Sequence, residues 1–226
     1  TCELVEAVRA ALQTGWLRSK NVLVTAGPTF EAIDAVRGIT NSSSGKMGYA
    51  IALAAMEAGA KVTLISGPTC LTPPAVDKVI HVVSANDMLI AVQAEISQTD
   101  IFISVAAVAD YRVEKINPQK IKKTDARLSL ELIPNPDILM TVSNLPRPPF
   151  CVGFAAETED LEKNAEIKRR KKKLPLLVAN LARDAIGSDE SELMLLDDAG
   201  KHMLPKASKT VQARHLIKHI GALYKQ

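Results

Sequence analysis

Residues 21–49, NVLVTAGPTFEAIDAVRGITNSSSGKMGY, decide the fold, because they pass from an apolar strand through a long polar loop into a helix start. The run Val22-Leu23-Val24 is typical of a buried strand, and Gly27-Pro28 ends it. The run Ser42-Ser43-Ser44-Gly45 precedes a helix that we expect to begin near Lys46. Small residues there leave backbone N–H groups accessible at the positive end of the helix dipole, so this loop predicts an anion site.

Two familiar phosphate-binding motifs are excluded by their spacing. A P-loop has four residues between its first glycine and the Gly-Lys pair and then Ser or Thr, whereas six residues separate Gly38 from Gly45 and Met47 follows Lys46. The dinucleotide fingerprint fails as well, because residues 26–31 (AGPTFE) carry bulky side chains where its second and third glycines belong. A surface loop that only caps a helix is the alternative for this segment.

The composition indicates an ordinary globular chain with one substantial core. Of its 226 residues 47% are hydrophobic, and 28 basic residues against 25 acidic ones give a net charge of +3, which predicts no nucleic-acid partner. No apolar run approaches the ~20 residues of a membrane span, so no membrane association is predicted. Cys2, Cys70 and Cys151 form neither a disulfide framework nor a zinc motif, which favours a reducing, cytoplasmic setting.

Strand-like and helix-like segments alternate along the chain, which is typical of βαβ units in a parallel sheet. We expect strands at 21–26, 61–66, 79–84, 101–108, 127–133, 150–156 and 175–179, a hairpin at 192–206, and helices at 46–59, 85–97, 138–144, 159–173 and 211–224. The predicted fold is α/β, a Rossmann-like parallel sheet flanked by helices, with a nucleotide at the carboxyl ends of its strands. Residues 21–226 form one predicted nucleotide-binding domain. Residues 1–20, with a linker helix at 3–13, are interpreted as the possible end of an upstream fused domain.

Six motifs in order resemble one family. They are Val24 to Thr29 (VTAGPT), Asn41 to Gly48 (NSSSGKMG), Ala106 to Arg112 (AAVADYR), Lys120 to Lys123 (KIKK), Asn135 to Ile138 (NPDI) and Gly153 to Thr158 (GFAAET). The chain from about residue 20 to 224 thus resembles phosphopantothenoylcysteine synthetase, the bacterial CTP-dependent phosphopantothenate–cysteine ligase of coenzyme A biosynthesis. The resemblance implies a homodimer that uses CTP and Mg²⁺ to convert 4′-phosphopantothenate into an acyl-cytidylate. Cysteine then displaces CMP to give 4′-phosphopantothenoylcysteine.

By this resemblance, Asn41, Lys120 and Arg37 are catalytic. The Asn41 amide can donate and accept without adding a nucleophile, which suits an acyl-phosphate carbonyl, and Arg37 and Asn41 would contact the intermediate together with Ala106 and Ala107. Lys120 lies in a lysine-rich segment that would form a flap and exclude water from the intermediate. Gly38 and Thr40 predict a flexible connection between Arg37 and Asn41. A turn asparagine and an exposed loop lysine are the alternatives.

The nucleotide-binding residues are also assigned by the resemblance. They are Gly27, Ser43, Ser44, Gly45, Ala106, Asp110, Lys120, Pro136, Asp137, Ile138, Leu139, Phe154, Lys168 and Lys172. Lys168 and Lys172 share one helical face and could neutralise a triphosphate, although such lysine runs are usually only solvated. Asp110, expected at the end of its strand, could accept from cytosine or ribose, or pair with Arg112 instead. No metal ligand is assigned, no flavin is expected in this domain, and the four histidines receive no role.

Two other functions are open at this point. Tyr111 and Lys115 match the YxxxK pattern of NAD(P)-dependent short-chain reductases, although here the tyrosine follows a strand. A catalytically silent nucleotide-binding or dimerisation module is the second alternative. If the ligase is correct, the partners are 4′-phosphopantothenate, CTP and cysteine, a second copy of the chain through residues 127–133 and 192–206, and a fused or associated flavin-dependent phosphopantothenoylcysteine decarboxylase.

Overall fold

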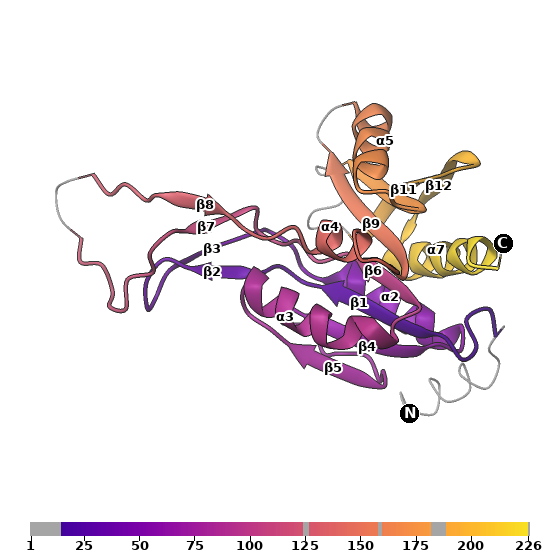
Figure 1. The fold of residues 1–226 in the computed structure, drawn as a ribbon, viewed down its shortest axis with the longest axis horizontal. Helices are drawn as coiled ribbons and strands as arrows, with labels where there is room; N and C mark the ends of the chain where they lie inside the picture. Colours follow the sequence, from indigo (N-terminus) through magenta and orange to yellow (C-terminus); the bar gives the residue numbers. More distant parts are fainter. Residues whose placement is uncertain (1–14, 124–126, 158–159, 182–188, 226) are drawn as a thin grey trace.

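An eight-stranded sheet forms the centre of the molecule (Figure 1). The computed structural model describes residues 15–123, 127–157, 160–181 and 189–225, so the linker helix predicted at 3–13 lies outside the described residues. In spatial order the strands are β12 (Gly200–Ser208), β11 (Glu190–Asp197), β10 (Leu176–Leu181), β9 (Phe150–Glu157), β6 (Ile101–Ser104), β1 (Asn21–Ala26), β4 (Lys61–Ser66) and β5 (Lys78–His81). The six strands from β10 to β5 are parallel, while β11 and β12 are antiparallel additions. The predicted Rossmann-like class is therefore confirmed.

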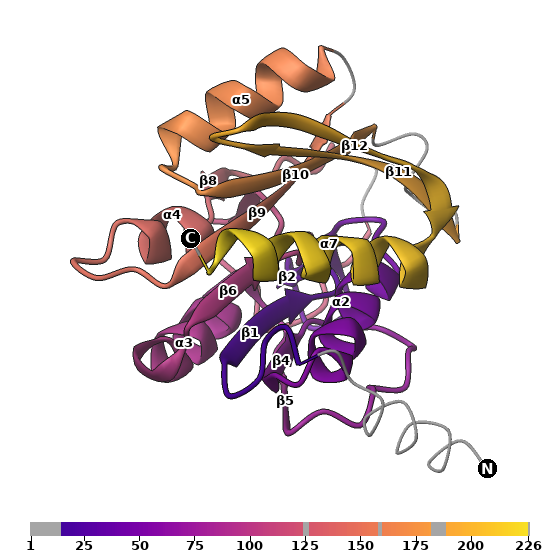
Figure 2. The same cartoon turned by 90° about the vertical axis from the view of Figure 1, so that its right-hand side faces the viewer.

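Helices cover both faces of the sheet. On one face lie α2 (Lys46–Glu57) and α7 (Lys209–Leu223), which run side by side (Figure 2). The other face carries α3 (Ala85–Glu95) with its 3₁₀ extension Ile96–Gln98, α4 (Ile138–Ser143) and α5 (Leu161–Lys171).

Alternation along β1 feeds both cores. Val22 and Val24 pack in the cluster under α2 and α7, whereas Leu23 packs under α3 and α4. A strand covered on both faces reads as a continuous apolar run, which explains the pattern seen in the sequence.

Two glycines fix α2 against the sheet. A Cβ on Gly48 would lie 2.5 Å from the Ala26 Cβ, so the helix can approach β1 this closely only with glycine there. Gly59, with φ of 88°, follows the helix, and its N–H bonds to Met56 O while Ala60 N–H bonds to Ala55 O. This is a C-terminal cap in which glycine takes the left-handed conformation.

Two short antiparallel pairs build an arm that projects from the body (Figure 1). One pair is β2 (Phe30–Ala32) with β3 (Gly38–Thr40), where the sequence predicted only a loop. The other is β7 (Tyr111–Val113) with β8 (Leu132–Pro134). Three-residue strands with few apolar side chains leave almost no periodic signal, which explains why the first pair was missed.

The predicted strand at 127–133 is wrong in extent, since only Leu132–Pro134 is a strand. Its alternating leucines suggested a half-buried face, but Leu128 and Leu130 are 57% and 40% exposed, so the core formed by the described residues does not cover them. The predicted flexibility at Gly38 is not what the structure shows. Gly38 lies in β3, where a Cβ would come within 2.3 Å of the Phe30 ring.

The strand predicted at 101–108 ends at Ser104. Beyond it the chain crosses the end of β1, where Ala107 pairs with Pro28 and its N–H donates to Gly27 O at 2.9 Å. These bonds take the backbone out of the sheet, so Asp110 lies beyond the strand and is exposed. Among the described residues, none of the helices combines the length and the hydropathy needed to cross a membrane.

Candidate active site

A cleft of about 910 Å³ opens at the carboxyl ends of β1 and β6. The strand order β5-β4-β1-β6-β9-β10 reverses direction between these two strands, so the cleft lies at the topological switch point. Loops leaving the two strands diverge to opposite sides there and leave a crevice between them. The parallel sheet therefore positions the cleft where the sequence predicted it.

The cleft brings together every predicted site residue except Arg37 and Lys120. They come from six separate segments of the chain: Gly27, Asn41, Ser43, Ser44, Gly45, Ala106, Ala107, Asp110, Pro136, Asp137, Ile138, Leu139, Phe154, Lys168 and Lys172. Lining residues that the sequence reasoning left out include Ser42, Lys46, Ser104, Asn135, Asn180 and Lys209.

The floor of the cleft is made of backbone. Gly27 and Gly45 have φ of 74° and 77°, a region that disfavours side chains, and a Cβ on Gly45 would lie 3.3 Å from Gly27 Cα. The first loop and the start of α2 therefore touch without side chains between them. Gly45 is the N-cap of α2, so this residue offers no capping side chain, and the first turn holds no acidic residue. The Gly45 and Lys46 N–H groups make only long hydrogen bonds, to Ser43 Oγ at 3.4 Å and to Ser44 Oγ at 3.5 Å. The amides of this helix start, together with the helix dipole, suit an anion in the cleft.

Asn41 is tied to the opposite wall of the cleft. Its side-chain amide donates to Ala107 O at 3.0 Å and to Val108 O at 3.2 Å. The loop that precedes α4 is bonded to the same segment. The Asn135 side-chain amide donates to Ala109 O at 2.9 Å, and Asn135 N–H donates to Asp110 O at 2.8 Å. These bonds hold three loops in register, and the loop of residues 107–110 is bonded to both of the others.

Asp137 and Lys172 form an ion pair in the cleft wall, with Lys172 Nζ 2.8 Å from Asp137 Oδ2. Asp137 also caps α4, since its Oδ1 accepts from Met140 N–H at 2.9 Å. The start of this short helix is therefore already capped by a carboxylate. Arg112, the alternative partner of Asp110, instead donates to Pro134 O and Asn135 Oδ1.

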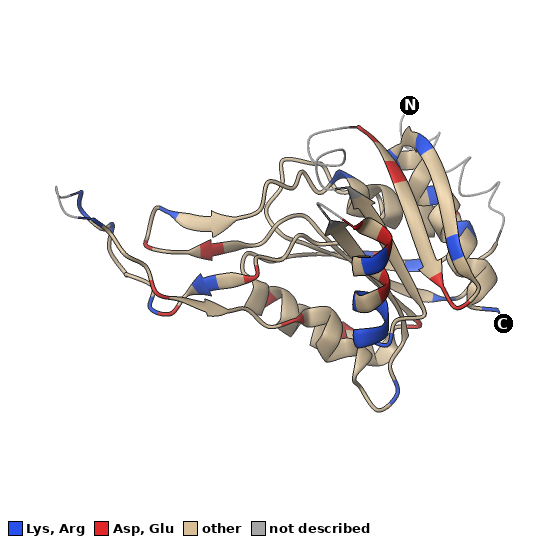
Figure 3. Cartoon of the chain, turned by 90° about the horizontal axis from the view of Figure 1, so that it is seen from above, with Lys and Arg blue, Asp and Glu red and all other residues tan. Residues whose placement is uncertain are grey.

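Four lysines border the cleft from three helices. Lys168 lies in the last turn of α5 and Lys172 is the C-cap of this helix, along which basic and acidic residues are mixed (Figure 3). Lys46 begins α2 and pairs with Asp189, and Lys209 begins α7. Burial lowers the pKa of Lys209, and the neighbouring Lys46 charge lowers this pKa further. Lys46 follows Gly45 directly and could have been found from the sequence, whereas Lys209 lies too far along the chain to leave a signal.

Arg37 and Lys120 lie outside the cleft, on the arm. Arg37 Nε donates to Asp34 Oδ2 at 3.0 Å, and Arg37 Nη2 donates to Ile121 O at 2.8 Å. The Asp34 side chain is buried, and the Arg37 guanidinium holds the pKa of its carboxyl well below the usual range. Asp34 Oδ2 also accepts from Ile121 N–H at 3.0 Å, so this pair fastens the segment that carries Lys120 to the β2–β3 hairpin.

Comparisons with known proteins agree with this arrangement. Residues 17–223 match the family model of the DNA/pantothenate metabolism flavoprotein C-terminal domain. The chain is 48% identical over 227 residues to the coenzyme A biosynthesis bifunctional protein CoaBC of Vibrio vulnificus (strain CMCP6), covering 98% of this chain and 57% of that protein. It is 43% identical over 215 residues to CoaBC of Escherichia coli (strain K12), covering 92% of this chain and 53% of the relative. The chain thus spans about half the length of these relatives.

Solved structures give the same result. The crystal structure of the C-terminal domain of a CoaBC protein has a TM-score of 0.81 and 38% identity, covering 94% of this chain and 99% of that one. A Cab2 variant in complex with phosphopantothenate-cysteine shares the fold at a TM-score of 0.77 and 17% identity, covering 99% and 94% of the two chains. From the extent of these matches, the chain belongs to the family of the DNA/pantothenate metabolism flavoprotein C-terminal domain.

Proposed function

We propose that this chain is the phosphopantothenate–cysteine ligase of coenzyme A biosynthesis, and that it works through an acyl-cytidylate made from CTP. One observation carries the proposal. The cleft at the switch point gathers the Asn41 amide and the lysines of α2, α5 and α7 around a helix start without an acidic first turn. Family membership supports the same conclusion, because the relatives are named for coenzyme A biosynthesis.

The first step is an attack by the substrate carboxylate oxygen on the α-phosphorus of CTP. The bond from that phosphorus to the bridging oxygen breaks, and pyrophosphate leaves with the electron pair. Lys168 and Lys172 neutralise negative charge on the phosphates, and the amides at the start of α2 bind a phosphate oxygen. Lys172 would exchange Asp137 for the nucleotide.

In the second step the cysteine amine attacks the acyl carbon, loses a proton, and expels CMP. Asn41 orients the acyl group, because its amide is held by Ala107 O and Val108 O and cannot rotate freely. Lys120 and Arg37 act after the flap segment has moved toward the cleft, which excludes water from the acyl-cytidylate. In the structure both side chains lie on the arm, so this movement is part of the proposal.

The cleft residues fit Mg²⁺ that is bound mainly by nucleotide phosphates. Among the described residues, two carboxylates line the cleft. Asp137 is paired with Lys172, so Asp110 is the carboxylate that would bind the ion. Mg²⁺ commonly uses one or two carboxylates together with phosphate oxygens and water. When bound, the ion would lower the charge on the triphosphate.

The test is pyrophosphate release from CTP with Mg²⁺ and 4′-phosphopantothenate, run with and without cysteine and repeated with ATP. We expect release that requires the acid, and CMP and the cysteine conjugate only after cysteine is added. Folded protein that releases no pyrophosphate with either nucleotide would leave a silent nucleotide-binding module. The reductase alternative has lost its basis, since Tyr111 lies in β7 and does not line the cleft.

We also propose that the chain forms a homodimer through its arm. Large apolar side chains are exposed along the arm at Val36, Tyr111, Ile116, Leu128 and Leu132. A second copy would cover such a patch, which is unusual on a monomer. Sedimentation velocity tests the idea: Leu132→Glu should give monomers, while Met203→Glu on the β11–β12 hairpin, the other predicted segment, should not. A wild-type monomer at micromolar concentration would refute the dimer.

Two further features remain proposals. The relatives are bifunctional and about twice as long as this chain, which supports a fused or associated flavin-dependent decarboxylase outside these residues. A cytoplasmic setting is supported by Cys70 and Cys151, which are unpaired in the described part of the chain.

A further inference from the structure

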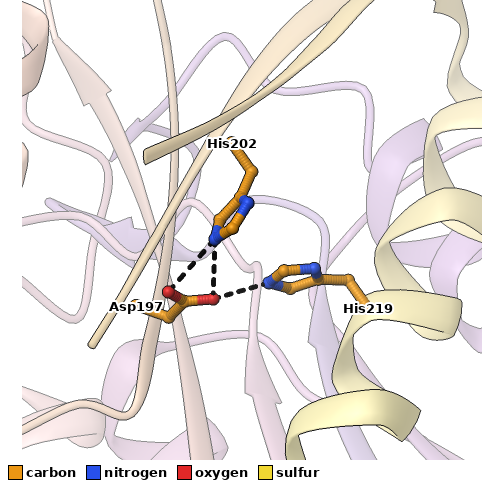
Figure 4. A group of neighbouring side chains, drawn as sticks. All are labelled: Asp197, His202 and His219. Atoms are coloured by element: carbon orange, nitrogen blue, oxygen red, sulfur yellow. Dashed lines mark hydrogen bonds and ion pairs between the residues drawn. The ribbon is translucent and has the colours of Figure 1, made fainter. Parts of the chain in front are cut away.

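Three polar side chains from three elements converge outside the cleft: Asp197, His202 and His219 (Figure 4). Asp197 ends β11, His202 lies on β12, and His219 lies on α7. His219 Nε2 is 2.8 Å from Asp197 Oδ2, and His202 Nε2 is 3.1 Å from the same oxygen. The two imidazole centroids are 4.8 Å apart. None of the three residues lines the cleft.

The three donor atoms have the spacing of metal ligands. All of them lie within 4.8 Å of one another. Zn²⁺ binds imidazole nitrogen and carboxylate oxygen at ~2.0–2.2 Å in tetrahedral sites, which puts neighbouring donors roughly 3.3 Å apart. The observed separations of 2.8 and 3.1 Å are those of hydrogen bonds from the two imidazoles to the carboxylate. An ion would replace the protons of these bonds, after the two Nε2 atoms are deprotonated and the imidazoles rotate slightly.

The carboxylate is held in place by its own turn. Asp197 Oδ1 accepts the backbone N–H groups of Ala199 at 2.8 Å and Gly200 at 3.1 Å. Its side chain is 2% exposed, so these bonds fix the orientation in which Oδ2 faces the histidines. Partners of this kind orient metal ligands in known sites.

The site is also open to solvent on its histidine side. The His202 and His219 side chains are 39% and 21% exposed, which leaves a route for an ion and room for water as a fourth ligand. Two imidazoles and one carboxylate with an open position form a ligand set that zinc uses.

We propose that Asp197, His202 and His219 bind a divalent transition-metal ion, Zn²⁺ above all, which ties the β11–β12 hairpin to α7. Gln212 already joins the same elements, since its amide donates to Ser191 O and Pro205 O, both at 2.7 Å. The ion would add a second tie near the other end of α7. The proposal does not depend on the ligase activity, because it concerns residues outside the cleft.

Calorimetric titration of the chelator-treated full chain with Zn²⁺, in excess Mg²⁺, tests this proposal. We expect one Zn²⁺ per chain, with affinity lowered at least about tenfold in His202→Gln and in His219→Gln. His81→Gln and His215→Gln are matched controls, since both histidines are exposed and outside the cluster, and they should bind as the wild type does.

A second measurement needs no variant. Cobalt replaces zinc in such sites, and tetrahedral Co²⁺ absorbs visible light far more strongly than hexahydrated Co²⁺. We expect this absorption with the wild-type chain and expect Zn²⁺ to abolish it. Absence of Zn²⁺ binding at micromolar concentrations, or binding unaffected by both ligand variants, would overturn the proposal and leave a carboxylate that is only hydrogen-bonded to two imidazoles.

Discussion

Arg37 is bound to Asp34 on the arm, outside the cleft, with Arg37 Nε 3.0 Å from Asp34 Oδ2. Because Asp34 Oδ2 also accepts from Ile121 N–H, one buried carboxylate connects the β2–β3 hairpin with the segment that carries Lys120. Arg37 and the predicted flap segment that carries Lys120 thus share one anchor.

We expect Asp34→Asn to impair catalysis by releasing this anchor. The uncharged amide of asparagine cannot neutralise the Arg37 guanidinium, and it weakens the hydrogen bonds that Asp34 accepts from Arg37 and from Ile121 N–H. The Lys120 segment therefore loses its fixed position. Steady-state kinetics should show kcat/KM lower by about ten- to a hundredfold. Glu57→Gln is the matched control, because Glu57 also forms a bidentate pair with an arginine. Arg214 donates to its carboxylate at 2.7 and 2.8 Å, and this pair lies outside the arm. Equal losses in both variants would argue against a role for the anchor.

Asn41→Asp should lower kcat by about a hundredfold or more while the protein stays folded. In the wild type, Ala107 O and Val108 O accept hydrogen bonds from the Asn41 amide. The carboxylate of the variant repels both oxygens and adds negative charge where phosphates are expected. Asn144→Asp removes a comparable bond outside the cleft, to Met140 O at 2.9 Å, and should leave kcat unchanged. Full activity of Asn41→Asp would refute the assigned role.

Lys168→Ala and Lys172→Ala should each raise the KM for nucleotide by about ten- to a hundredfold, because a charge-assisted hydrogen bond contributes ~1.5–3 kcal/mol. Lys171→Ala on the same helix is the control, since Lys171 is exposed and does not line the cleft. Nucleotide KM values at two salt concentrations provide the readout. A uniform small effect of all three variants would indicate general surface charge instead of specific contacts.

Gly48→Ala should destabilise the protein by about 1–3 kcal/mol, because the added methyl would lie 2.5 Å from the Ala26 Cβ. Urea unfolding monitored by circular dichroism measures this change. Adding Ala26→Gly removes the clashing atom, so the double variant should recover part of the loss. A Gly48→Ala protein as stable as the wild type would show that α2 can move away from β1 at little cost.

The Glu166 carboxylate should make stability depend on pH in acid. Hydrogen bonds from two arginines lower the pKa of Glu166 from 4.5 to about 2, and the bond from Arg169 has a larger effect than the bond from Arg170. A pKa that is lower in the folded state stabilises the protein above about 4.5, and this contribution is lost as the pH falls toward about 2.

Urea unfolding across this pH range checks the prediction. Glu166→Gln should be less stable than the wild type at neutral pH, and the difference should shrink in acid. Glu192→Gln on β11 serves as the control, because Glu192 is exposed. A difference that stays constant with pH would contradict the prediction.

Local patterns were enough to predict most of the fold and much of the candidate site. Apolar runs and glycines marked the strands and helices of the parallel sheet, and parallel strands must end at one edge, which predicted a nucleotide there. The resemblance to the family then supplied the individual residues, among them Gly27, Asn41 and Asp110. The short arm strands escaped this reasoning, because a three-residue pair such as β2–β3 has no periodicity to detect.

What the sequence alone determined is the α/β class, which follows from hydrophobic periodicity, and the family resemblance with most of the cleft residues, which follows from ordered motifs. Tertiary structure alone decided which distant side chains meet. It paired Arg37 with Asp34 outside the cleft, brought Lys209 to the cleft, and set His202 and His219 on one carboxylate. The reason is physical: contacts between residues far apart in sequence depend on strand order and helix packing, which no local pattern encodes.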